Sequence, residues 1–209
     1  MMRRLALMIA LVAPATANAH EVWVERDGNG PARIYLGEPA EAMPAGGDPE
    51  FKNLTAPKIV GQANVPLVRR AGYIEAAVAP GDVRVTDDSV FQPWGEAGAK
   101  EGVVYYARAG RSETGTRMTY EIAPLSAGAN RFALLHNGKP VASAKMTLIA
   151  PDRKSVELTA GADGAVDVPV AGKGRYLLNS AQVETGRLRV AGGPVDKLHH
   201  IATTTFVVP

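Results

Sequence analysis

Cysteine is absent from the 209 residues of this chain. Its absence excludes disulfide bonds, thiolate metal ligands and cysteine nucleophiles. Any bound metal ion must therefore be held by nitrogen and oxygen donors. Aromatic residues are also scarce, at 6% of the chain with two tryptophans. That leaves little material for the flat aromatic surface on which an enzyme could bind a polymer.

An excess of charge of either sign is also lacking. The chain has 23 Lys and Arg against 21 Asp and Glu, and two of the arginines, Arg3 and Arg4, belong to a basic head at the start of the sequence. Without this head the basic and acidic residues are equal in number. No basic run or patch points to a nucleic acid partner.

The first 19 residues have the pattern of a secretory signal peptide. The basic head is followed by an apolar run at 5–13, and Ala17 and Ala19 occupy the two small-residue positions of an A-x-A cleavage site. No later apolar run approaches the roughly 20 residues that cross a bilayer. We therefore expect residues 1–19 to be removed and the mature protein to lie in the periplasm without a membrane span.

Cleavage after Ala19 would make His20 the first residue of the mature chain. Its free α-amine and its imidazole would then lie on one residue and could chelate a single metal ion. The square-planar amino-terminal copper and nickel motif needs histidine at the third mature position, which is Val22 here. The sequence thus predicts a chelate centred on His20, unless this histidine is incidental to where the protein begins.

The first half of the mature chain reads as short strands. Residues 22–26 and 32–36 flank a turn at 27–30 that contains two glycines, which predicts a hairpin with His20 at its start. Residues 37–54 read as a long loop with one helical turn at 49–54. Further strands are expected at 58–60, 65–69, 73–78, 83–86, 103–108 and 117–122.

The second half predicts an immunoglobulin-like sandwich. The dipeptide Asn137-Gly138 predicts a hairpin between 131–136 and 142–149, and Asp163-Gly164 predicts another between 156–159 and 166–170. Strands at 174–178 and 199–208 follow. Linker-like composition near Ser126 divides the chain into an N-terminal β-rich domain, 20–125, and an immunoglobulin-like domain, 129–209. The expected fold class is therefore all-β, with two sandwich domains.

Three other histidines could add ligands to His20. His136 lies beside a turn, where polar side chains are usually exposed to water. His199 and His200 are neighbours on a strand, so they point to opposite faces and cannot both reach one ion without a bulge. We take both as candidate metal ligands and favour His199, which stands nearer the preceding loop.

Oxygen donors near these histidines have simpler interpretations. Glu21 and Glu25 follow His20, and Glu184 lies in a segment that looks like a turn before the last strand. Carboxylates of this kind are usually solvated surface charges. Of the adjacent Tyr105 and Tyr106, we expect one to face the core and the other to face outward.

Several short motifs, in this order, resemble a periplasmic NikM-like family of unknown function that is associated with nickel uptake. The motifs are His20-x-x-Trp23-Val24-Glu25, Tyr35-Leu36-Gly37-Glu38, Tyr105-Tyr106-Ala107-Arg108, Asn137-Gly138-Lys139-Pro140 and His199-His200-Ile201-Ala202-Thr203. The resemblance spans nearly all of the mature chain. It implies two β-rich domains, the second immunoglobulin-like, and a role in nickel or cobalt delivery to an inner-membrane uptake system.

Three functions follow as hypotheses. The first is a periplasmic protein that binds nickel, cobalt or copper through His20 with His199 or His200, and buffers the ion or delivers it to a membrane importer. The second is a copper oxygenase that uses the same chelate on a polymer. The third is a structural or docking module without metal. No nucleophile elbow, P-loop, H-E-x-x-H or dinucleotide fingerprint is present in the sequence, so we expect no enzyme activity.

Overall fold

The structure is a computed structural model that describes residues 20–209; the predicted signal peptide, 1–19, lies outside the described residues. The described part is all-β, as expected, with a single short 3-10 helix, η1 (Pro49–Asn53), at the place where the sequence predicts a helical turn. None of its helical structure is long and apolar enough to cross a membrane.

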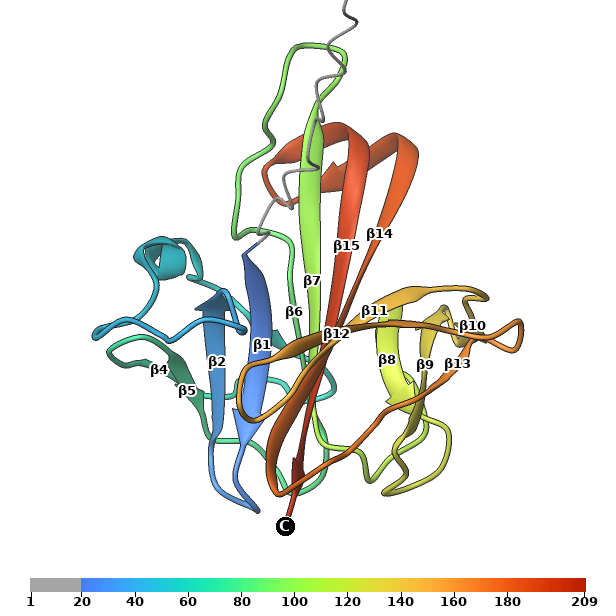
Figure 1. The fold of residues 1–209 in the computed structure, drawn as a ribbon. Helices are drawn as coiled ribbons and strands as arrows, with labels where there is room; N and C mark the ends of the chain where they lie inside the picture. The colour runs from blue at the N-terminus through green and yellow to red at the C-terminus, as the bar shows by residue number, and fades with distance from the viewer. Residues whose placement is uncertain (1–19) are drawn as a thin grey trace, which may run out of the picture.

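Residues 20–209 form fifteen strands in three sheets (Figure 1). The N-terminal sheet has the order β1 (Glu21–Arg26), β2 (Ala32–Gly37), β5 (Ile74–Ala76) and β4 (Leu67–Arg69). The central sheet has the order β12 (Ser155–Thr159), β11 (Lys145–Ile149), β14 (Gly174–Val190), β15 (Gly193–Val208), β7 (Glu101–Ala109), β6 (Val83–Asp87) and β3 (Lys58–Ile59). The third sheet contains β10 (Lys139–Pro140), β9 (Arg131–His136), β13 (Ala165–Asp167) and β8 (Tyr120–Pro124).

The central sheet joins strands from both halves of the chain. Its middle strand β15 pairs with β14 in antiparallel fashion and with β7 in parallel, so that His199 lies opposite Val103 and Thr203 opposite Ala107. Four of its strands follow Ser126 in the sequence and three precede it. The segment around Ser126 itself connects β8 to β9, which pair with each other.

Both faces of the central sheet are covered, and successive residues of β15 show this. Thr203 and Thr205 donate hydroxyl hydrogen bonds to the carbonyl oxygens of Val22 and Val24 in β1, whereas Thr204 donates to Ile122 in β8. One hydrophobic core therefore lies between the N-terminal and central sheets, and a second lies between the central and third sheets. The middle of the central sheet is therefore buried on both faces, although β15 with β7 is the only parallel pair among its described strands.

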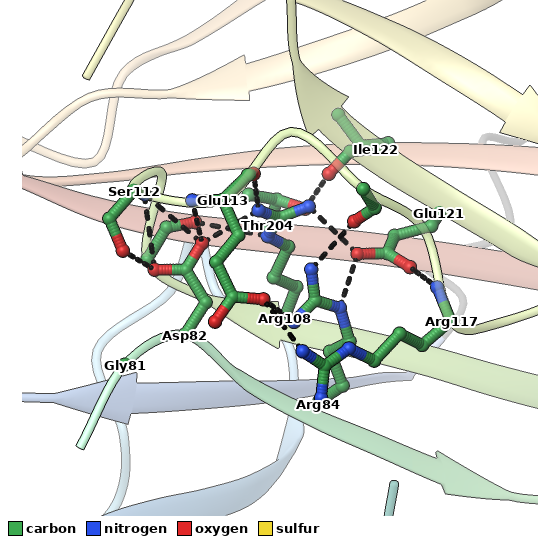
Figure 2. A network of polar contacts seen from close by, with 12 residues as sticks. Gly81, Asp82, Arg84, Arg108, Ser112, Glu113, Arg117, Glu121, Ile122 and Thr204 are labelled. Atoms are coloured by element: carbon green, nitrogen blue, oxygen red, sulfur yellow. Dashed lines mark hydrogen bonds and ion pairs between the residues drawn. The ribbon is translucent and has the colours of Figure 1, made fainter. Parts of the chain in front are cut away.

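A buried charge network fastens the central sheet to β8 (Figure 2). Arg84 on β6 and Arg108 on β7 both donate to Glu121 Oε1, at 2.7 and 2.8 Å. Arg84 also pairs with Glu113, and Arg108 with Asp82. Both guanidinium groups and the Glu121 carboxylate are almost wholly excluded from water. The ion pairs between them must therefore offset the free-energy cost of removing these charges from water.

The strand pairs predicted for the two hairpins of the second half are wrong. The turn at Asn137-Gly138 forms with positive φ at both residues, and β10 returns along β9 for two residues only. The chain then crosses to the central sheet, where β11 pairs with β12 and β14. Similarly β12 and β13 belong to different sheets, because β13 pairs with β9. The strand expected at 117–122 lies at Tyr120–Pro124 instead.

The last two strands form one long hairpin that the sequence does not reveal. β14 extends to Val190 and β15 begins at Gly193, with a bulge between Thr185 and Leu188. Glu184 is therefore in a strand, opposite Leu198, and its expected place in a turn is wrong. In Figure 1 the upper ends of β7, β14 and β15 extend beyond the end of β1.

Candidate functional site

His20 lies directly before β1 and is fixed in place through its main chain. Its carbonyl oxygen accepts a hydrogen bond of 3.0 Å from the hydroxyl of Tyr105 on β7. Burial raises the pKa of Tyr105 far above its usual value, with Glu21 and Asp87 adding to the effect, so the hydroxyl keeps its proton and remains a donor. The start of β1 is thus attached to the central sheet.

The imidazole of His20 is oriented by Asp48. Its Nε2 lies 3.1 Å from Asp48 Oδ1, and the edge of the ring faces Phe91 at 6.5 Å between centroids. The same carboxylate oxygen accepts a hydrogen bond from the Glu50 amide and so caps the start of η1. Within residues 20–209 no hydrogen-bond partner lies at His20 Nδ1.

Carboxyl groups gather around His20. Glu38 has a raised pKa because of partial burial and the neighbouring Glu41, while His20 acts in the opposite direction. Glu21 is buried, and this burial, together with Glu38, raises its pKa to about 8. Glu21 is therefore largely neutral at pH 7, and the carboxyl group in direct contact with the His20 ring is that of Asp48.

The expected surface position of Glu21 is wrong. Its Oε1 accepts a hydrogen bond from Asn179 on β14, and within the described chain its buried Oε2 has no partner. The reason is the placement of β1 across the central sheet, so that its odd-numbered side chains contact β14. Trp23 likewise packs against Leu177 of β14 and Ile149 of β11.

His199 and His200 point to opposite faces of β15, as the alternation of strand residues requires. His199 Nε2 lies 2.6 Å from Glu101 Oε2, and its ring stacks on Trp94 at 5.8 Å. Glu101 also accepts from Lys197 at 2.7 Å, and these two partners lower the pKa of Glu101. His199 is partly exposed at the projecting end of the hairpin.

His200 is buried in the second core with both ring nitrogens engaged. Nδ1 lies 3.1 Å from the Tyr106 hydroxyl, and Nε2 lies 3.1 Å from Glu184 Oε2. The ring stacks on Tyr120 at 4.5 Å. Burial lowers the pKa of His200 despite the opposing effect of Glu184, so the neutral imidazole is favoured.

His136 and the pair of Tyr105 and Tyr106 are more buried than the sequence predicts. His136 is partly buried and its ring lies parallel to Tyr120 at 4.3 Å, so it packs against the second core instead of simply facing water. Tyr105 and Tyr106 lie on opposite faces of β7, but both are buried. The expected outward tyrosine is wrong because both faces of the central sheet are covered.

The structure gives the three candidate ligands separate partners. His20 contacts Asp48, His199 contacts Glu101, and His200 contacts Tyr106 and Glu184. Among residues 20–209, no group of three or more His, Asp or Glu side chains is arranged to hold a metal ion. Side chains alone therefore do not complete a metal site in this arrangement, and a chelate at His20 depends on its main-chain nitrogen.

Asp48 is a neighbour of the His20 ring that the sequence does not predict. It lies 28 residues from His20, in a loop without sustained periodicity. The one local signal is Asp48 directly before Pro49, the usual start of a helical turn. That signal indicates a capping residue and carries no information about which imidazole the carboxylate meets.

Comparison with known proteins found no matching family model, no matching curated protein and no matching solved structure. The resemblance to the NikM-like family remains a prediction based on the motifs quoted above.

Proposed function

We propose that the mature protein begins at His20 and binds one nickel, cobalt or copper ion in the periplasm, either to buffer the ion or to deliver it to an inner-membrane importer. The α-amine of His20 and its Nδ1 form the chelate. Nitrogen donors of this kind suit Ni²⁺ and Cu²⁺.

The contact between His20 and Asp48 supports this proposal most strongly. A chelate through the α-amine needs Nδ1, and Asp48 occupies the other ring nitrogen at 3.1 Å. A carboxylate hydrogen-bonded to the far nitrogen of a metal-binding imidazole fixes the ring and increases its basicity. The arrangement around His20 thus has the geometry that a ligand at Nδ1 requires.

The other two histidines differ in their suitability as a further ligand. Both ring nitrogens of His200 have partners within a buried cluster. His199 is partly exposed, and within residues 20–209 only its Nε2 has a hydrogen-bond partner. We therefore assign any second imidazole to His199.

The experiment compares the chain starting at His20 with the same chain preceded by Ala19. Calorimetry with Ni²⁺ and Cu²⁺, carried out in buffers of different ionisation enthalpy, measures affinity and proton release. We expect the chain starting at His20 to bind one ion with release of protons, and the extended chain to lose most of this affinity. Equal affinity of the two forms would remove the chelate from the proposal.

A side-chain variant tests the role of Asp48. Asp48→Asn keeps an oxygen that can cap η1 but removes the negative charge beside His20, and we expect the affinity for metal to fall about 10- to 100-fold. Asp167→Asn is the matched control, because Asp167 is 84% exposed on β13. Mass spectrometry of the protein from a periplasmic extract would show where the mature chain starts, and a start other than His20 would overturn the proposal.

A further inference from the structure

A cleft with a volume of about 330 Å³ lies between β1 and β2 on one side and β11 and β14 on the other. Its floor is apolar and consists of Trp23, Tyr35, Met43, Ile149 and Leu177. The rings of Trp23 and Tyr35 stack at 5.1 Å with an angle of 13° between their planes. A pocket of this size with an apolar floor suits a small organic molecule.

Two of the four charged side chains that line the cleft are already neutralised. Arg175 pairs with Glu25 at 3.3 Å and also with Asp27. Glu25 in addition accepts a hydrogen bond from the indole nitrogen of Trp23 at 3.2 Å. These contacts hold the stacked rings of the floor in place and leave little charge for a ligand.

Arg153 and Glu41 are the other two charged residues of the cleft. Within residues 20–209, neither has an ion-pair partner at 4 Å or less. Both side chains are exposed at the rim. The cleft therefore offers one cation and one anion that are not already paired, together with an apolar floor.

Arg153 is also held in an unfavourable backbone conformation. Its φ is +65°, and its amide donates to the carbonyl oxygen of Ala150 at 2.8 Å in the turn after β11. Glycine or asparagine adopts this conformation at lower cost, and strain of this kind is concentrated at ligand-binding positions. A glycine at position 153 would relieve the strain, but it would not place a guanidinium group at the cleft.

We propose that this cleft binds a small zwitterion of the amino-acid type with an apolar side chain. Arg153 binds its carboxylate, Glu41 binds its ammonium group, and the side chain packs on the floor around Trp23 and Tyr35. A charge-assisted bond to guanidinium suits a carboxylate. The site needs no metal and does not use His20 as a ligand contact, although Glu41 neighbours Glu38, which lies near His20.

The test uses L-phenylalanine and L-tryptophan as probes with the ¹⁵N-labelled protein. The indole N–H signal of Trp23 is assigned with Trp94→Phe, which removes the only other indole in the chain. We expect at least one of the two probes to shift the Trp23 signal in a saturable manner. 3-Phenylpropionate and 2-phenylethylamine each lack one charge, and we expect each to bind about tenfold or more weakly than the zwitterion, as the loss of a charged hydrogen bond requires.

Variants at the rim separate binding at this cleft from general effects. We expect Arg153→Gln and Glu41→Gln each to weaken binding of the probe about tenfold or more, whereas Arg189→Gln, an exposed arginine on β14, leaves it unchanged. The proposal is overturned if neither zwitterion saturates the signal by about 10 mM, beyond the millimolar range of weak ligands. It is also overturned if both rim variants bind as tightly as the unaltered protein.

Discussion

Glu21 is a carboxyl group that the fold keeps protonated near neutral pH. Burial is the main cause of its raised pKa of about 8, and one of its oxygens has no partner in the described chain. The usual pKa of such a group in an unfolded chain is near 4.5. The folded form therefore binds a proton that the unfolded form releases over this pH range.

The sign of the resulting effect on stability follows from this difference. A group whose pKa is raised by folding stabilises the fold fully below its unfolded pKa, and the contribution is lost as the pH rises toward the folded value. For Glu21 this range is from about 4.5 to about 8. The free energy of unfolding should fall by up to about 1.4 kcal/mol per pH unit from this residue alone.

Glu21→Gln tests this expectation, because an amide resembles the protonated carboxyl at every pH. We expect the variant to gain stability relative to the unaltered protein as the pH rises from 5 to 7.5. Urea unfolding of both proteins without metal, at the two pH values, measures the difference. A difference that stays constant between the two pH values would show that Glu21 does not hold a proton in the fold.

The sequence identified the reactive histidine side chains but not the residues they contact. The predicted cleavage site singled out His20, and strand alternation correctly separated His199 from His200. Asp48 and Glu101 could not be predicted, because each meets its histidine across a distance of 28 or 98 residues in the sequence. Nor could the burial of Glu21, which follows from how β1 crosses β14.

The buried charge network joins β6 and β7 to β8 and to the loop before β8. Glu121 is the shared acceptor of two arginines, and all three side chains are buried. Arg117 contributes its amide as a further donor, to Glu121 Oε2 at 2.8 Å. A buried group with this many charged partners is costly to remove.

We expect Glu121→Gln to lower the free energy of unfolding by about 3–5 kcal/mol, because it leaves Arg84 and Arg108 buried with too little negative charge. Glu157→Gln is the matched substitution in an exposed ion pair with Lys145, where the expected loss is about 1 kcal/mol or less. Chemical denaturation measures both values. Similar losses for the two variants would mean that the network contributes no more than a surface ion pair.

The elements that the sequence predicted best are those with local signals. The hairpin of β1 and β2 forms around a glycine-containing turn, and η1 begins at a proline. Turn residues at Asn137-Gly138 also predicted the turn itself. They could not predict that β11 leaves the third sheet after β10, because strand partners are selected by contacts far away in the sequence.

The length of β14 and β15 had no local signal either. Exposed residues prevail between Ala181 and Arg189, so this part lacks the alternation of a half-buried strand. Its pairing with β15 provides the backbone hydrogen bonds that make it a strand. The strand conformation of the projecting part of β14 therefore results from its pairing with β15, which in turn pairs with β7. The amino-acid composition of this part does not by itself predict a strand.

The central sheet is built from strands of both halves of the chain. β7 pairs with β15 over nine residues, and β1 receives two hydroxyl hydrogen bonds from β15. The first core also includes Ile201 from β15. Residues 20–125 alone would expose one face and one edge of β7.

We expect a chain of residues 20–125 to lack a cooperative unfolding transition, because its core would be incomplete and an unpaired edge of this length favours aggregation. Thermal denaturation followed by circular dichroism, with the chain of residues 20–209 as the control, tests this expectation. A cooperative transition for the shorter chain would show that the first half forms an independent domain, as its composition predicts.

The position of β15 has a consequence for when the protein can fold. The strand that occupies the middle of the central sheet is made from Gly193–Val208, which leaves the ribosome after all its neighbours. Until these residues emerge, β7 and β14 have no strand between them and neither core can close. A nascent chain of this protein should consequently complete neither core before Gly193–Val208 has been synthesised, because each core includes residues of this strand.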